Sequence, residues 1–299
     1  MVLLLLNKQE KKWDIITAED KGNLSEEEQE QVLNLPKRFI GCLNHYKNQI
    51  QNENNDVVII IVGDEGSGKS SLQGNILEYI SDGRFDPQKD LIGADYIDGL
   101  NKIQNVKRRG WLGFDEGNSF FLATETVKRE HRDLHKIFSI FRQKNLFVSI
   151  CLPSFFRLGS YFAVDRSDGL LRTYLKKGKK GLFVYHGNKS KNKLYRIGKK
   201  TYNHLMVRPE IRSKFYKCPK LETEEYKKFK AVTLDIEIRK AVEKSKPPKT
   251  ENDIKVEQRL QIIRANIEEP TANVAKILGI TERRVQQLKK QINEEISLK

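Results

Sequence analysis

The sequence predicts an α/β fold, in which helices flank a parallel sheet, followed by a small all-helical C-terminal domain. Residues 57–62, 111–114 and 146–152 are apolar runs, and a run that is apolar on both faces is typical of a strand inside a parallel sheet. Helical patterns separate these runs, and strands that alternate with helices indicate an α/β fold. Residues 254–299 carry a helical pattern instead.

The 299 residues divide into four predicted segments. Residues 1–55 form a polar, mostly helical N-terminal extension, in which an amphipathic helix starts at Pro36. This extension either covers an edge of the core or contacts a neighbouring subunit. Residues 56–244 form the α/β domain, and residues 245–253 form a linker that two prolines stiffen. The helical domain, residues 254–299, ends the sequence.

The chain carries 55 Lys and Arg residues against 40 Asp and Glu residues, a net charge of +15. An excess of this size indicates a polyanionic partner, which is either a nucleic acid or an acidic membrane surface. No apolar run approaches the roughly 20 residues of a membrane-spanning helix. The opening MVLLLL is too short for a signal-peptide core. We therefore expect a cytoplasmic protein without a membrane span.

The cysteine and histidine patterns indicate neither a disulfide framework nor a zinc site. Cys42, Cys151 and Cys218 are sparse, odd in number and without a CxxC pair, so we expect the reduced thiols of a cytoplasmic protein. His131 and His135 are four residues apart but lack the HExxH pattern. We expect both to be surface histidines.

A glycine-rich segment directly follows the first predicted strand. Gly63-Asp-Glu-Gly-Ser-Gly68-Lys69-Ser70 fits G-x-x-x-x-G-K-[ST] at every fixed position, and a helix is predicted from Ser71 to Ile80. Glycines let the backbone curl around a phosphate, so that N–H groups and the helix N-terminus face the anion. We expect Lys69 to reach the β/γ-phosphates of ATP, and the Ser70 hydroxyl to bind Mg²⁺. The predicted nucleotide-binding residues are Gly63, Asp64, Glu65, Gly66, Ser67, Gly68, Lys69, Ser70 and Ser71.

An acidic pair, Asp115 and Glu116, ends the second apolar run. An acid at the tip of such a strand holds Mg²⁺ in P-loop proteins, so Asp115 is the second candidate metal ligand. Glu116 is the candidate general base that polarises the attacking water. This pair favours nucleotide hydrolysis over phosphoryl transfer to a small molecule.

The order of these features over about residues 56–165 resembles the additional-strand P-loop ATPases. Walker A at 63–70 and Walker B at Asp115-Glu116 precede a charged helix, about 124–141, and then Arg142-Gln143-Lys144-Asn145 leads into a strand. The group includes FtsK/HerA-type DNA translocases, conjugation coupling ATPases, viral packaging ATPases and zonula-occludens-toxin-like phage proteins. The resemblance implies a setting in a virus or mobile element and a ring of identical subunits, usually a hexamer.

In such rings an arginine of one subunit reaches the neighbour's nucleotide, and arginine stabilises transition-state charge in phosphoryl transfer. We favour Arg142 and Arg157, which flank the third apolar run, as catalytic residues. Each candidate could instead lie on a solvated face or in an ion pair. Many translocases also carry a γ-phosphate-sensing Gln where Leu152-Pro153-Ser154 stands here, and Ser154 would be a weak substitute. The full set of candidates for the arginine that reaches the neighbouring subunit is Arg129, Arg132, Arg142 and Arg157.

Residues 176–220 hold 15 Lys or Arg residues and one acid, Glu210. Interleaved aromatics predict a DNA-tracking surface, because cations neutralise phosphates and aromatic rings stack on bases. The alternatives are a solvated basic face whose aromatics belong to the core and, less favoured, a membrane surface. A hairpin is predicted between 181–187 and 193–197. The aromatics are Phe183, Tyr185, Tyr195, Tyr202, Phe215 and Tyr216.

Residues 271–288 resemble a helix-turn-helix. Ala275 is small where two helices would cross, and Gly279 permits the turn. We expect a core of Val274, Leu278, Ile280, Val285 and Leu288. Side chains on the outer face of the second helix could meet base edges or phosphates in a DNA groove, although some such units bind protein or merely pack. The predicted DNA-binding residues are Thr281, Arg283, Arg284, Gln287 and Lys290.

The favoured hypothesis is a Mg-ATP-dependent, DNA-stimulated ATPase, a translocation, packaging or transfer motor that a C-terminal helix-turn-helix recruits to DNA. One alternative is an ATP-switched DNA-binding regulator or partition factor, which predicts slow turnover. A less favoured alternative is a small-molecule kinase, which would phosphorylate a small acceptor. DNA-stimulated turnover distinguishes the motor from both.

Overall fold

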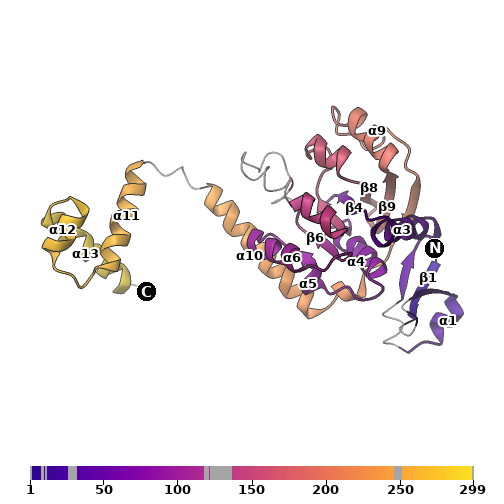
Figure 1. Cartoon of the computed structure of the whole chain (residues 1–299), viewed down its shortest axis with the longest axis horizontal. Helices are drawn as coiled ribbons and strands as arrows, with labels where there is room; N and C mark the ends of the chain where they lie inside the picture. Colours follow the sequence, from indigo (N-terminus) through magenta and orange to yellow (C-terminus); the bar gives the residue numbers. More distant parts are fainter. Residues whose placement is uncertain are drawn as a thin grey trace. The chain divides into compact units, whose positions relative to one another are not determined.

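The computed structural model describes residues 2–7, 10, 12–25, 32–117, 121, 137–245 and 251–297. The chain divides into two compact units, Met1–Ile238 and Arg239–Lys299, which are described separately below (Figure 1). Among the described residues, no helix is long and apolar enough to cross a membrane.

A seven-stranded sheet with the order β10-β9-β8-β4-β7-β6-β5 forms the centre of the first unit (Figure 1). The strands β5, β6, β7, β4 and β8 run parallel, and β9 and β10 add an antiparallel edge. The predicted α/β class is confirmed, and the three predicted strands correspond to β4, β6 and β7. The strands are β4 (Val57–Gly63), β5 (Leu91–Ile92), β6 (Trp111–Phe114), β7 (Phe147–Leu152), β8 (Gly169–Lys176), β9 (Lys179–Gly187) and β10 (Ile211–Lys214).

Strand β4 is buried on both faces because helices cover both sides of the sheet. Ile59 and Ile61 pack in a core that includes α3 and α4, whereas Ile60 and Val62 face a second core that includes helical residues 137–141. The part of the predicted 124–141 helix before residue 137 lies outside the described residues. The described helices of this unit are α1 (Ala18–Gly22), α3 (Lys37–Gln51), α4 (Lys69–Ile80), α5 (Pro87–Asp90), α6 (Tyr96–Asn105) and α9 (Asn188–Gly198), with a π-helix at Tyr161–Asp165 and a 3-10 turn at Pro219–Leu221. Helix α10 (Glu224–Ser245) begins in this unit, and its residues from Arg239 onward belong to the second unit.

The register of the parallel strands brings the loop and the acidic pair to one edge of the sheet. Val62 pairs with Leu152, and Phe114 pairs with Ile150, so β4, β7 and β6 all end at the same edge. Strand β7 lies between β4 and β6. Ligand sites in open α/β sheets lie at the carboxyl ends of the strands.

The expectation of a helical N-terminal extension is wrong for residues 2–7 and 12–16. The strands β1 (Val2–Asn7), β2 (Lys12–Ile16) and β3 (Leu33–Leu35) form an antiparallel sheet of order β2-β1-β3. Leucine is a good helix former, but intrinsic propensity is overridden here because β1 pairs with a strand on each edge. The helix predicted after Pro36 is present as α3, and it packs on the sheet core through Phe39, Leu43 and Tyr46.

The hairpin predicted between 181–187 and 193–197 is also wrong. The partner of β9 is β8, and the turn between them uses the positive φ angles of Lys177 and Gly178. Residues 193–197 lie instead in α9. The buried residues Lys191, Leu194, Tyr195 and Gly198 recur at helical spacing, which is the signal that predicts a helix here.

The second unit contains α11 (Glu251–Ala265), α12 (Thr271–Leu278) and α13 (Glu282–Ser297). Gly279 ends α12 with a φ of 61°, a left-handed conformation that glycine adopts without a steric penalty. Of the predicted linker, residues 246–250 lie outside the described residues, and 251–253 begin α11. The buried core is Ile263, Val274, Ala275, Val285, Leu288 and Ile292, with Leu260, Ile267, Leu278 and Ile280 packed against it.

Candidate nucleotide site

Glycine is required at two positions of the segment 63–70, called the phosphate loop below. Gly63 has a φ of 151°, and a Cβ there would lie 2.3 Å from the carbonyl oxygen and from Oγ1 of Thr173. Gly68 is the N-cap of α4 with a φ of 97°, and its Cβ would lie 2.9 Å from the ring of Phe215. The loop therefore adopts a backbone that side chains at these positions would block.

Side chains tie the phosphate loop to itself and to β8. The Ser67 hydroxyl donates to the Asp64 carbonyl at 2.6 Å and lies 2.7 Å from the Thr173 hydroxyl. The Lys69 ammonium donates to the carbonyls of Gly63 at 2.8 Å and Asp64 at 3.1 Å. Because α4 starts at Lys69, the N-terminus of a 12-residue helix opens next to this ammonium.

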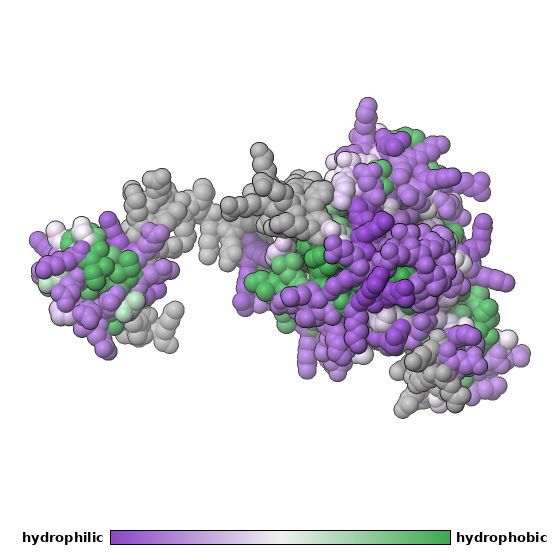
Figure 2. All heavy atoms as spheres, viewed as in Figure 1, coloured by the Kyte–Doolittle hydropathy of each residue, from purple (hydrophilic) through white to green (hydrophobic). Residues whose placement is uncertain are grey.

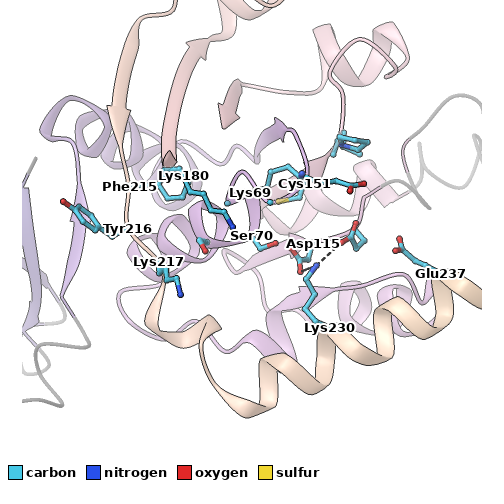
Figure 3. Close-up of a pocket in the computed structure, with 18 residues that line it drawn as sticks. Lys69, Ser70, Asp115, Cys151, Lys180, Phe215, Tyr216, Lys217, Lys230 and Glu237 are labelled. Carbon is cyan, nitrogen blue, oxygen red and sulfur yellow. Dashed lines mark hydrogen bonds and ion pairs between the residues drawn. The ribbon is translucent and has the colours of Figure 1, made fainter. Parts of the chain in front are cut away.

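The acidic pair lies across the cavity from the loop and makes contacts that the sequence did not predict. Asp115 is buried, and its Oδ2 accepts from the Tyr226 hydroxyl and from the Lys230 ammonium, each at 2.9 Å. The same ammonium lies 2.9 Å from Glu116 Oε1. The Oδ1 atom of Asp115 has no hydrogen-bond partner within the described part of the chain. Figure 3 shows Lys230 extending from α10 toward Asp115.

The two α10 groups respond to this environment in their pKa values. Burial and the neighbouring Asp115 carboxylate raise the pKa of Tyr226. Burial, the largest single influence, would lower the pKa of Lys230, but Asp115, Tyr226 and Glu116 together outweigh it and the net pKa is raised. Tyr226 is therefore a neutral donor and Lys230 a protonated cation at neutral pH. Burial also raises the pKa of the Cys151 thiol well above its usual value, so this thiol is neutral.

A cavity of about 650 Å³ joins the loop and the acidic pair (Figure 3). Six predicted residues outside the loop glycines line it together: Glu65, Lys69, Ser70, Ser71, Asp115 and Glu116. Residues from four other regions close it, and these regions are the end of β7, the start of β9, the segment after β10, and α10. The additional lining residues are Cys151, Leu152, Pro153, Lys180, Gly181, Phe215, Tyr216, Lys217, Lys230 and Glu237.

The residues at the cavity fit Mg²⁺ bound with a nucleotide. The Ser70 hydroxyl and Asp115 Oδ1 are hard oxygen donors, which Mg²⁺ prefers, and Oδ1 has no partner within the described part of the chain. Mg²⁺ usually takes one or two protein oxygens and completes its shell with phosphates and water. The described residues contain no group of three or more His, Cys, Asp or Glu side chains that could hold a metal ion.

Tyr226, Lys230 and Thr173 are the site residues that sequence reasoning missed. Tyr226 and Lys230 lie more than 100 positions after Asp115 and reach it only through the packing of α10. A signal existed: Tyr226, Lys230 and Glu237 recur at spacings that share one helix face. Thr173 carried no such signal, because its role depends on the pairing of β8 with β4.

The two candidate arginines within the described residues do not lie at the acidic pair. Arg142 and Arg157 are exposed and do not line the cavity. Arg129 and Arg132, like His131 and His135, lie outside the described residues. Ser154 follows the cavity-lining Pro153 but does not line the cavity itself.

The aromatics of the basic stretch mostly belong to the core, so the prediction that they stack on bases is wrong for four of them. Phe183, Tyr185, Tyr195 and Phe215 are at most 5% exposed. Successive side chains of a strand point to opposite faces, so Phe183 and Tyr185 share one face of β9, which packs against Phe39 of α3. The two exposed rings are those of Tyr202 and Tyr216.

One cation of the basic stretch is interior. The Lys191 ammonium is fully buried and donates to the carbonyls of Ala163 at 2.7 Å and Val164 at 3.1 Å, and to the Ser167 hydroxyl at 2.9 Å. All three of its N–H groups are therefore used within the protein. Burial lowers the pKa of this ammonium to about 8.

A second concentration of positive charge surrounds a cavity of about 960 Å³ at the start of β6, away from the phosphate loop. Its acidic lining is limited to Asp90 and Asp98. The view in Figure 2 shows a largely hydrophilic surface over the first unit. The basic residues that line this cavity are Arg84, Lys89, Lys102, Lys107, Arg108 and Arg109.

The predicted DNA-binding residues of the second unit lie on its surface. All five are exposed at the start of α13 or along it, and Arg284 donates to the Gln287 side chain at 3.1 Å. Apolar atoms gather at the centre of this unit and hydrophilic residues surround them (Figure 2). The five residues are Thr281, Arg283, Arg284, Gln287 and Lys290.

No model of a protein family and no curated protein matches this chain. The functional interpretation therefore depends on the geometry of the loop, the acidic pair and the cavity between them.

Proposed function

We propose that this chain is a Mg-ATP-dependent ATPase that acts on DNA as a translocation, packaging or transfer motor of a virus or mobile element. The observation that carries the proposal is that Lys69, Ser70, Asp115 and Glu116 line one cavity. The sheet supports it too, because one strand, β7, lies between the loop strand β4 and the acidic strand β6. Because these three strands run parallel, their carboxyl ends bring the loop and the acidic pair to one edge of the sheet.

Each residue has a defined role in the proposed reaction. The loop N–H groups and Lys69 bind the phosphates, and Ser70 with Asp115 would hold Mg²⁺, which supplies neutralisation of phosphate charge. Glu116 accepts the proton of the attacking water. Tyr226 donates to Asp115 Oδ2 and so orients that carboxylate, leaving Oδ1 for the metal side.

DNA binding would use three basic surfaces: the exposed cations of residues 176–220, the basic cavity at the start of β6, and α13 of the second unit. Cations on these surfaces would bind phosphates in a salt-dependent manner. We propose that α12 and α13 act as a helix-turn-helix. The exposed Arg142 and Arg157 remain candidates for an arginine that acts on a neighbouring subunit of a ring.

The test is steady-state ATP hydrolysis with and without single- and double-stranded DNA. We expect DNA to stimulate hydrolysis about tenfold or more, and the Glu116→Gln variant to lose about 10²- to 10⁴-fold in rate while it still binds ATP. A chain that binds ATP but hydrolyses it slowly, with or without DNA, would contradict the motor.

That result would favour the second candidate, an ATP-switched DNA-binding regulator or partition factor. The observation that favours this candidate is the exposed row of polar side chains on α13, which needs no turnover to bind DNA. This candidate predicts sequence-specific DNA binding with an affinity that changes when ATP is bound.

A further inference from the structure

Lys230 occupies a position that the proposed roles leave unexplained. Its ammonium lies 2.9 Å from Asp115 Oδ2 and 2.9 Å from Glu116 Oε1, so it links the candidate metal ligand to the candidate general base. An ammonium has three N–H donors. Two serve these carboxylates, and the third has no acceptor within the described ranges, although the ammonium lines the cavity.

Helix α10 holds this ammonium in a fixed place. Thr233, one turn after Lys230, is buried so closely against Gly93 that a Cβ on the glycine would lie 2.4 Å from the threonine Oγ1. The Tyr226 and Phe229 rings stack, and Lys102 of α6 lies over the Phe229 ring. The charge of Lys230 is thus presented by a packed helix, which is the condition for electrostatic preorganisation.

The contact between Lys230 and Glu116 indicates which phosphate of bound ATP would lie nearest to Lys230. Lys69 lies at the phosphate loop, where we expect it to reach the β- and γ-phosphates of ATP. Glu116 must lie beside the attacking water, and that water must approach the terminal phosphorus in line with the bond that breaks. A cation bonded to Glu116 therefore faces the terminal phosphoryl group.

We propose that Lys230 is a catalytic residue that donates its third N–H to the γ-phosphoryl oxygens of ATP bound in the same chain. This inference rests on the proposed ATPase function. In hydrolysis, water attacks phosphorus, Glu116 takes the proton, and the bond to the β-phosphate oxygen breaks with ADP as leaving group. Negative charge spreads over the γ-phosphoryl oxygens, and a fixed cation there stabilises it.

The opposing interpretation is that Lys230 merely neutralises Asp115 and competes with Mg²⁺ for it. The two interpretations predict opposite effects of removing the charge. A catalytic lysine makes the rate fall, whereas a competitor makes the rate or the apparent Mg²⁺ affinity rise.

The experiment measures ATP hydrolysis and the affinities for fluorescent ATP and ADP analogues in Lys230→Met, Lys230→Gln and Lys230→Arg variants of the full chain. We expect Met and Gln to lower kcat about 100-fold or more, and Arg to restore it to within about tenfold. ADP affinity should stay the same, and the preference for ATP over ADP should be lost. Lys230→Gln keeps a donor for the carboxylates, so it serves if Lys230→Met does not fold.

The matched control is Lys227→Met, which removes the charge of an exposed lysine on the same helix, where the ammonium pairs with Glu224 at 2.6 Å. We expect its kcat to stay within about twofold of wild type, since an exposed ion pair of this kind contributes little. Hydrolysis by Lys230→Met and Lys230→Gln at the wild-type rate or faster overturns the role of Lys230. Failure of the wild-type chain to bind or hydrolyse ATP overturns the proposed function instead, so the two failures are distinguishable.

Discussion

The phosphate loop and the basic stretch of residues 176–220 are the two most conspicuous regions of the sequence, and only the loop lies as its residues predict. In the loop, Gly63, Gly68 and Lys69 each have a place that a backbone dihedral or a close contact requires. In the basic stretch, composition predicts a charged surface with aromatic rings, but most of those rings and one lysine are interior. A spaced motif constrains individual positions, whereas a composition constrains only a total.

The largest expected effect is at the loop. Replacing Lys69 with Ala removes the cation beside the N-terminus of α4, so binding of the phosphates weakens and their charge in the transition state is no longer stabilised. We expect kcat/KM for ATP to fall at least about 10²- to 10³-fold. A coupled ATPase assay measures this, and wild-type turnover in the Lys69→Ala variant would contradict the assignment of the loop.

The next effect distinguishes core from surface in the basic stretch. Phe183 is fully buried against Phe39 and Phe215, so Phe183→Ala should lower the free energy of unfolding by about 3–5 kcal/mol. The exposed Tyr216 is the matched control, and Tyr216→Ala should change the free energy of unfolding by less than about 0.5 kcal/mol. Urea denaturation measures both. Equal stabilities of the two variants would argue that Phe183 is not a core residue.

A smaller effect is expected at the β8–β9 turn. Lys177 and Lys179 are exposed, and each contact of such a lysine with a phosphate contributes about 0.9 to the slope of log affinity against log salt. The Lys177→Ala/Lys179→Ala variant should therefore bind DNA more weakly with a slope reduced by up to about 2. Fluorescence anisotropy at several salt concentrations tests this. An unchanged slope would remove this turn from the DNA-binding surface.

The smallest effect concerns pH. Burial lowers the pKa values of His186 and His204 to about 4, whereas an unfolded histidine titrates near 6.5. The unfolded chain therefore binds more protons than the folded chain between these pH values. The contribution of the two neutral histidines to the free energy of unfolding is fully present above pH 6.5 and is lost as the pH drops toward 4. Thermal melts should decline less steeply over this range in a His186→Gln variant. Identical declines would show that His186 does not titrate as described.

Local patterns predicted much of the fold because burial on both faces leaves a readable apolar run. Strands β4, β6 and β7 correspond to such runs, and helix α4 corresponds to the helix predicted after the glycine-rich segment. Together they carry Lys69, Ser70 and Asp115 to one edge. Strand β1 was missed because leucine-rich segments suit either helix or strand until a pairing partner is present.

The part of the site that could not be predicted comes from distant segments. Lys230 meets Asp115 only because α10 packs over the carboxyl edge of the sheet, and no local periodicity encodes which element a helix face will meet. Thr173 closes on the loop through the register of β8 with β4. Motif spacing therefore identifies the site residues within one segment, whereas tertiary packing decides which residues of distant segments lie beside them.

The buried Lys191 should differ from the exposed lysines of the β8–β9 turn in its chemical reactivity. An amine-reactive reagent needs an accessible, unprotonated amine, and the exposed lysines of the turn offer one whenever they deprotonate. Lys191 has all three donors engaged and no surface, so it reacts only when α9 leaves the π-helix. The extent of modification of Lys191 over time therefore reports how often α9 separates from the π-helix. The exposed lysines of the β8–β9 turn serve as internal standards when the modified protein is digested and its peptides are measured.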